Sequence, residues 1–112
     1  DDAGVGVNAR SAEMNRTLSF SPTERRMIEL AKTFPTFVRR PEAIEPWRPR
    51  DLDSWAAAAS HGEKLAAQFL LAVWDPSHEW ACGRFDVMEA LSIWDVPHRE
   101  AFLAWASAPW WP

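Results

Sequence analysis

The strongest hydrophobic pattern in the chain lies between residues 54 and 74, where apolar side chains recur at every third or fourth position. This spacing is typical of a helix that buries one face. An aspartate, Asp51 or Asp53, precedes the pattern and is a good helix-capping residue. We therefore predict one long central helix over residues 54–74, roughly 30 Å long. Its apolar positions are Trp55, Ala58, Ala59, Gly62, Leu65, Ala66, Phe69, Leu70 and Val73.

A second helical pattern follows the sequence SPTE at residues 21–24. Ser21 can cap a helix, Pro22 suits its first position, and Glu24 completes a capping box. The apolar stripe that follows ends before Phe34-Pro35, so we predict a helix that ends near Thr33. Residues 1–19 have no such pattern, and we interpret them as a flexible N-terminal arm attached to a single α-helical domain at residues 20–112.

The stretch from residue 35 to residue 53 combines four prolines with several apolar side chains. Proline disrupts helix interiors, whereas the apolar content is too high for a solvated linker. We therefore predict an extended proline-rich strap over residues 35–53 that lies across the domain.

Three shorter helices are predicted in the C-terminal part, each beginning after a capping aspartate. The first runs over residues 76–82 after Asp75 and stops at Gly83. The second follows Asp86, with Glu89 completing another capping box, and ends at Trp94. The third follows Asp95 and covers residues 96–107. Because no stretch of the sequence alternates with a period of two, the predicted fold class is all-α, a small single-domain helical bundle.

The sequences around the predicted starts of two of these helices are similar: residues 71–78 read LAVWDPSH and residues 91–98 read LSIWDVPH. In both, an apolar run ends in Trp, Asp follows, and proline comes within the next two positions. These features are typical of a turn between two helices. We therefore predict one structural corner built twice, with a duplicated functional site as the alternative.

The composition adds an unusual choice of aromatic residues, since the 112 residues include eight Trp, six Phe and no Tyr. Each buried indole N–H needs an acceptor, which the many Asp and Glu side chains can supply. The lone Cys82 excludes an intrachain disulfide and favours a reducing compartment, so we expect a cytoplasmic protein. The uncharged apolar run at residues 65–74 is too short to span a bilayer, so we expect no membrane insertion.

The net charge of −4 is unevenly distributed. Residues 1–50 carry nine Lys and Arg against seven Asp and Glu, whereas residues 51–112 carry three against nine. This distribution disfavours nucleic-acid binding by the C-terminal half, because phosphate contacts need clustered positive charge. The basic candidate is the middle of the chain, where arginines alternate with Phe37 and Trp47. These arginines are Arg39, Arg40, Arg48 and Arg50.

Reactive side chains are few. His78 and Cys82 would share a face of the predicted 76–82 helix, which allows a metal site or a cysteine nucleophile. No paired Cys or His motif, glycine-rich phosphate loop or orienting third residue accompanies them. We therefore expect a packed cysteine, no metal, no cofactor and no catalytic residues.

Protein binding remains as the favoured function. Pro46 to Arg50 has the PxxP-plus-Arg form of an SH3-type ligand, although we expect Trp47 to pack inward. The terminal Trp110 and Trp111 either fold back onto the core or expose apolar surface that needs a partner. We thus predict a non-enzymatic protein–protein interaction or regulatory module. The alternatives are a nucleic-acid-binding regulator that uses the Arg/Trp strap and a metal-dependent or cysteine enzyme centred on His78 and Cys82. The predicted partner-binding residues are Arg39, Arg40, Trp47, Arg48, Arg50, Trp110 and Trp111.

Overall fold

The computed structural model describes residues 21–112, and this part of the chain is helical, with no strand. The predicted all-α class is therefore confirmed, whereas the predicted arm at residues 1–19 lies outside the described residues. In chain order the elements are α2 (Pro22–Ala31), α3 (Pro35–Arg39), the 3₁₀ helix η1 (Pro41–Ala43), α4 (Pro49–Ala57), α5 (His61–Trp74), α6 (Val87–Ile93) and α7 (Val96–Ser107).

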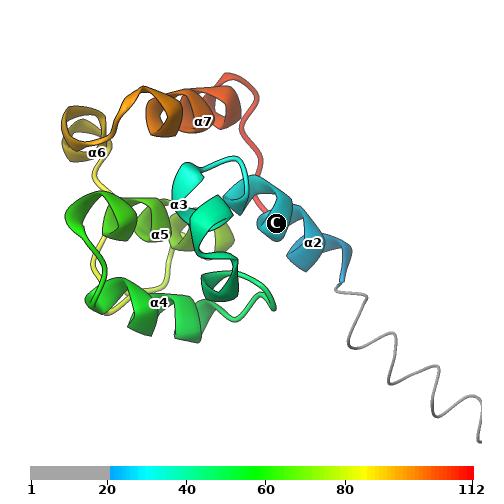
Figure 1. Ribbon diagram of the computed structural model, residues 1–112. Coiled ribbons are helices and arrows are strands. Elements are labelled where there is room, and N and C mark those ends of the chain that lie inside the picture. Colours follow the sequence, from blue (N-terminus) through cyan, green and yellow to red (C-terminus); the bar gives the residue numbers. More distant parts are fainter. Residues whose placement is uncertain (1–20) are drawn as a thin grey trace, which may run out of the picture.

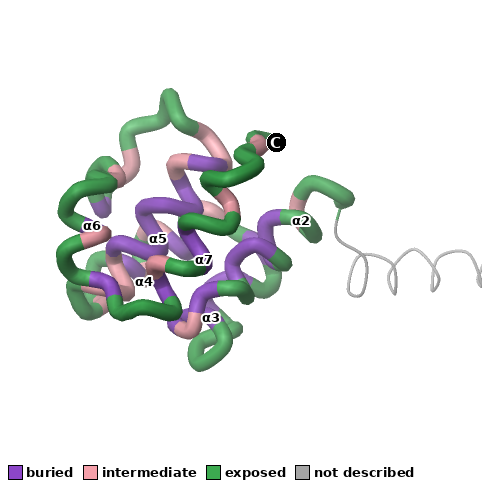
Figure 2. The backbone as a smooth tube through the Cα atoms, turned by 90° about the horizontal axis from the view of Figure 1, so that it is seen from above, coloured by how far each residue is buried: buried purple, intermediate pink, exposed green. Residues whose placement is uncertain are grey.

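Helix α5 lies at the centre of the domain, between α4 on one side and α6 and α7 on the other (Figure 1). Helix α2 packs against α5 as well. The buried residues concentrate along α5 and on the inner sides of the helices around it (Figure 2). Helix α5 supplies the largest share of the core because almost all of its second half is buried.

The first helix forms as the sequence predicts. The Ser21 hydroxyl accepts the N–H of Glu24 at 3.1 Å, and the Glu24 carboxylate accepts the N–H of Ser21 at 3.1 Å. This capping box satisfies backbone donors that the first turn leaves without intrahelical partners. Helix α2 ends at Ala31, two residues before the predicted end, and its buried stripe is Met27, Ile28, Leu30 and Ala31.

The prediction of a single helix over residues 54–74 is wrong, because the chain turns at residues 58–60 and forms α4 and α5 instead. Ser60 begins the second helix: its hydroxyl accepts the N–H of Glu63 at 3.4 Å, and Glu63 accepts the N–H of Ser60 at 3.0 Å. This second capping box competes with helix continuation at that position. Helix α4 is consequently free to fold back along α5.

The prediction of an extended strap over residues 35–53 is also wrong. Pro35, Pro41 and Pro49 each occupy the first position of a helix, where the missing N–H costs no intrahelical hydrogen bond. The prolines therefore initiate α3, η1 and α4. Most apolar side chains of this stretch still cover the core as expected, since Phe37 and Ile44 are fully buried, whereas Val38 is exposed.

The predicted helix over residues 76–82 does not form either, and residues 75–86 make a connection of turns. The two similar sequences consequently have different structures. Asp95 caps α7 by accepting the N–H of His98, whereas Asp75 accepts only the N–H and hydroxyl of Ser77. His98 is buried, and its counterpart His78 is exposed.

The last two helices match their predictions closely. Asp86 caps α6 through the N–H of Glu89, and α7 spans residues 96–107. The capping box predicted at Asp86 and Glu89 forms only in part. The Glu89 carboxylate does not bond back to Asp86, because it lies 2.6 Å from the His61 ring of α5. The core between α5 and α7 is aromatic, with Phe69 contacting Phe102 and Trp105 edge-on at ring-centroid distances of 5.4 and 5.1 Å. Among the helices of residues 21–112, none has both the length and the apolar character needed to cross a bilayer.

Candidate functional site

A cleft of about 550 Å³ opens beside the start of α4. Such a volume falls in the range of small-ligand and peptide-anchor sites. Its walls come from three segments: the residues that begin α4, the last residue of α5, and the connection that follows α5. The lining residues are Trp47, Arg48, Pro49, Arg50, Asp51, Trp74, His78 and Trp80.

The cleft exists because α4 runs back along α5, which brings the start of α4 close to the end of α5. Asp53 of α4 then holds the connection in place: its carboxylate accepts the N–H of Ala81 at 2.9 Å and that of Cys82 at 2.8 Å. Burial opposes ionisation of this carboxyl, but its interactions with Cys82 and Ala81 outweigh burial and lower the pKa of Asp53. Trp80, one residue earlier, is thereby held at the cleft.

A second contact fixes the same connection from the side of α5. The buried Gln68 amide donates to the carbonyl of Cys82 at 2.6 Å. Gly83 follows with a φ of +99°, and a Cβ at this glycine would lie 3.2 Å from Gln68 Nε2. The backbone angle therefore favours glycine at this position, and a Cβ would in addition make a tight contact with Gln68.

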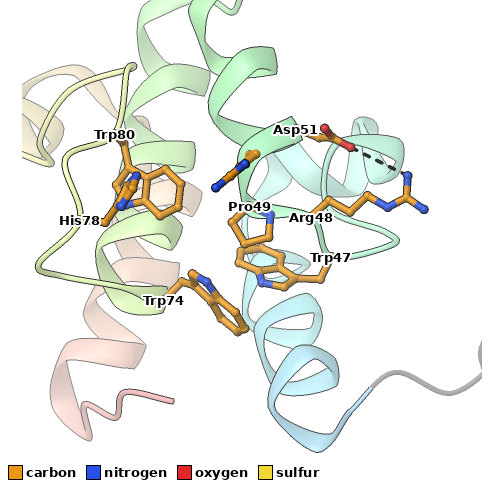
Figure 3. A pocket seen from close by; sticks show the side chains of 8 residues that line it. Trp47, Arg48, Pro49, Asp51, Trp74, His78 and Trp80 are labelled. Atoms are coloured by element: carbon orange, nitrogen blue, oxygen red, sulfur yellow. Dashed lines mark ion pairs between the residues drawn. The ribbon is translucent and has the colours of Figure 1, made fainter.

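The aromatic walls face each other across the cleft (Figure 3). The indole of Trp47 meets that of Trp74 edge-on at a centroid distance of 5.5 Å, and the His78 ring lies 4.2 Å from that of Trp80. Trp47 is 4% exposed, while Trp74 and Trp80 are partly exposed. The opening is thus bounded by flat rings, which favour planar or proline-like groups.

Two of these indoles share an unusual property. Within residues 21–112, the buried side-chain donors that lack a hydrogen-bond partner are Trp47 Nε1 and Trp80 Nε1. Buried polar groups are almost always paired, and leaving one unpaired costs free energy. Both unpaired donors belong to the walls of one cleft, so an acceptor supplied there would remove that cost.

The charged residues of the cleft carry one more positive than negative charge, from Arg48 and Arg50 against Asp51. The Arg48 guanidinium extends toward Asp51 at 4.0 Å and away from His78 and Trp80 (Figure 3). Arg50 is exposed and has no ion pair within the described part of the chain. Arg48 also provides no side-chain cap for α4, so the positive end of the helix dipole adds to the local potential.

The other predicted binding residues do not join this site. Arg39 and Arg40 lie at the end of α3 and are exposed. Hydrogen bonds with Ser60 and the nearby positive charges of Arg40 and Arg39 lower the pKa of Glu63. These two arginines therefore lie near acidic groups of the domain itself.

The terminal indoles have a separate location as well. The Arg26 guanidinium of α2 lies 3.9 Å from the ring centroid of Trp110, a cation–π contact that keeps this indole partly buried. Trp111 is 55% exposed but meets Trp105 edge-on at 5.3 Å. Trp105 Nε1 donates to the carbonyl of Trp110 at 3.1 Å. The chain end thus folds back onto α2 and α7.

The pair considered as an alternative site of metal or thiol chemistry lacks the required environment. The helix that was to align His78 and Cys82 is absent, and Cys82 is buried. Burial, together with the neighbouring Asp53 carboxylate, raises the pKa of the Cys82 thiol to about 12. Nucleophilic cysteines need the opposite shift. Across residues 21–112, no three His, Cys, Asp or Glu side chains gather in a way that would hold a metal ion.

A hydroxyl–imidazole–carboxylate series does occur, between α3 and α7. His98 Nδ1 lies 2.7 Å from Asp95 Oδ1, and His98 Nε2 lies 2.7 Å from the Thr36 hydroxyl. The Thr36 amide donates to the same nitrogen at 3.3 Å, which assigns the ring proton to Nδ1. Catalytic triads expose the hydroxyl and bury the carboxylate. Here the order is reversed, because Thr36 is 1% exposed, so the series joins two helices.

No family model, curated protein or solved structure matches this chain. The interpretation of the cleft therefore depends on its geometry alone. Of the predicted binding residues, the structure brings Trp47, Arg48 and Arg50 together. Trp74 and Trp80, which join them in the cleft, were not among the predicted binding residues. The available signal was the indole content of residues 71–80, which we had attributed to a repeated corner and a short helix.

Proposed function

We propose that the protein is a non-enzymatic interaction module that docks a short extended segment of a partner protein in the Trp47–Trp80 cleft. The observation that carries this proposal is the pair of buried, unpaired indole N–H groups in the walls of one open cleft. An extended peptide offers backbone carbonyls, which are the acceptors that these donors lack. Its side chains would occupy the space between the indole rings.

The charge distribution favours a peptide over a nucleic acid. A strand of DNA or RNA needs a positive groove that follows several phosphates, with aromatic rings for successive bases. The cleft has two arginines, one of which is directed toward Asp51, and Arg39 and Arg40 face other acidic groups. The whole chain carries a net charge of −4, which repels a polyanion.

The lining of the cleft also favours binding over catalysis. None of its eight residues is a Ser, Thr, Cys or Lys, and the ring of His78 rests against Trp80. The lining thus lacks a nucleophile that this histidine would activate. A cytoplasmic location, which the lone reduced cysteine favours, forms part of the same proposal.

The test is selection of peptides from a random displayed library, followed by titration of synthetic versions. Binding is compared for the wild type, for Arg50→Glu, and for a variant that combines Arg50→Glu with Trp74→Ala. We expect the double variant to lose about tenfold or more in affinity, because it removes a ring and reverses a charge in the cleft. Circular dichroism establishes that each variant is folded.

The matched control combines Arg25→Glu with Trp111→Ala, which makes the same types of change on exposed residues outside the cleft. This control should bind the selected peptides as the wild type does. Equal binding by both double variants would contradict the proposed site. Failure to select any peptide would contradict the proposed function.

A further inference from the structure

We infer that the segment bound by the cleft is a proline-containing polyproline II stretch flanked by carboxylates, an inference that rests on the proposed function. Residues 46–50 have the sequence form of a proline-rich ligand. In the structure Pro49 begins α4 and Trp47 is buried, so this segment instead builds the wall of a receptor.

The unpaired indoles select the backbone conformation of the ligand. In a helical ligand most carbonyls are already bonded within the helix, so they are poorer acceptors for Trp47 and Trp80. In a polyproline II segment the carbonyls have no internal partners, and the fixed φ angle of proline lowers the entropy lost on binding. Proline rings also pack on the flat faces of aromatic side chains, which is how aromatic-lined grooves bind such segments.

The charge of the cleft selects the flanking residues. Arg50 is exposed beside the aromatic walls without an ion pair among the described residues, and the uncapped first turn of α4 adds positive potential. A glutamate or aspartate next to the prolines would pair with Arg50 and approach this helix end. A lysine or arginine at the same place would meet a like charge.

The burial of the indole donors adds a requirement for movement. Trp47 Nε1 and Trp80 Nε1 are both shielded from solvent, so a ligand oxygen reaches them only when neighbouring cleft side chains shift. Trp74 and Arg50 border the same cleft and are at least partly exposed, which leaves room for such a shift. Binding should therefore be visible at the indoles themselves.

The experiment titrates four blocked octapeptides into the ¹⁵N-labelled protein. The probe has four prolines between pairs of glutamates, and its partners replace the prolines with alanines, the glutamates with lysines, or both. Eight Trp residues give eight indole N–H signals. We expect the Glu–Pro probe to move the signals of Trp47 and Trp80 downfield as they gain an acceptor. Those of Trp94 and Trp105 should stay, because these N–H groups already donate to backbone carbonyls.

Assignment and specificity come from conservative variants. Trp80→Phe keeps an aromatic ring, removes one signal and weakens binding of the Glu–Pro probe. Arg50→Glu should weaken the same probe by about tenfold and favour the Lys–Pro peptide, while Arg25→Glu should leave both affinities unchanged. These results together would support the inference.

Other outcomes separate the two levels of the proposal. If library-selected peptides bind in the cleft but the Glu–Pro probe binds no better than its alanine partner, the polyproline inference is overturned and the proposed function stands. Equal binding of the Lys–Pro and Glu–Pro peptides would overturn the inference that carboxylates flank the prolines of the ligand. If no peptide binds, or if only a single-stranded oligothymidine moves the signals of Trp47 and Trp80, both levels are overturned.

Discussion

Trp94 and Trp47 are both 4% exposed, yet their indole N–H groups have different surroundings. Trp94 donates to the carbonyl of Gly62 at 3.0 Å, whereas Trp47 has no acceptor. The acceptors of the paired indoles, Trp94 and Trp105, are backbone carbonyls, not the Asp and Glu side chains that the composition suggested. At the scale of the residue, similar burial therefore leaves one indole satisfied and the other available.

This difference predicts unequal costs for the same substitution. Trp94→Phe and Trp47→Phe both remove part of a buried ring, but only the first also removes a hydrogen bond. We expect Trp94→Phe to lower the free energy of unfolding by about 1 kcal/mol more than Trp47→Phe. Urea unfolding at neutral pH measures both values. Equal losses would show that the N–H of Trp47 has a partner in solution.

At the scale of the element, the connection of residues 75–86 depends on contacts from the neighbouring helices as well as on its own glycine, Gly83. Asp53 of α4 and Gln68 of α5 bind consecutive polar groups around Cys82, and Gly83 provides the turn. This explains why the helix predicted over residues 76–82 does not form: the N–H groups of Ala81 and Cys82 are bound by a side chain 28 or more positions away.

The hydrogen bonds of Asp53 predict a dependence of stability on pH. The pKa of Asp53 is lower in the folded protein, so its contribution is present above the unfolded value of 3.8 and is lost as the pH falls through the folded pKa. Asp53→Asn leaves one of the two N–H groups without a strong acceptor. It should cost about 1 kcal/mol at pH 7, and less near pH 3.

Urea unfolding of the wild type and of Asp53→Asn at both pH values provides the measurement. The exposed Asp51, two residues earlier on the same helix, is the control, and Asp51→Asn should change stability little at either pH. A cost of Asp53→Asn that stays constant with pH would contradict the role of its ionised form.

Capping residues in the sequence correctly identify where three of the helices begin. The SPTE sequence at residues 21–24 and the aspartates before α6 and α7 give those helices directly. The same type of signal is present at Ser60 and Glu63, but the apolar period across it is stronger, and this period suggested one helix. Periodicity reports which face is buried, and both α4 and α5 bury theirs against the same core.

The candidate site was less accessible to prediction because its parts are far apart in the sequence. Trp47, Trp74 and Trp80 meet only after α4 folds back along α5, and no local pattern encodes that reversal. Proline was also misleading. In residues 35–53 it begins helices, whereas we took it as evidence for an extended chain.

At the scale of the whole molecule, the chain end closes one side of the domain. Trp110 lies beneath Arg26, and Trp111 meets Trp105, so the final residues join α2 and α7. The terminal tryptophan pair, for which the sequence left both core packing and exposure open, is thus divided into one partly buried ring and one exposed ring.

This division predicts that Trp110→Ala lowers the melting temperature more than Trp111→Ala does. The first variant loses a partly buried indole together with its cation–π contact, a cost of about 2 kcal/mol, and the second loses about half as much. Neither variant should change peptide binding, because both lie outside the cleft. Differential scanning calorimetry with peptide titration measures both properties. A larger effect of Trp111→Ala, or lost binding, would place a partner surface at the chain end.

The turn at residues 58–60 between α4 and α5 determines whether the cleft forms at all. A continuous helix from residue 49 to residue 74 would hold Arg50 and Trp74 about 36 Å apart, at 1.5 Å per residue. In the folded chain the two side chains line one cleft. Substitutions that straighten this turn would abolish the cleft while leaving every wall residue unaltered, so natural variation at Ser60 would bear on the proposed recognition as directly as variation at the tryptophans.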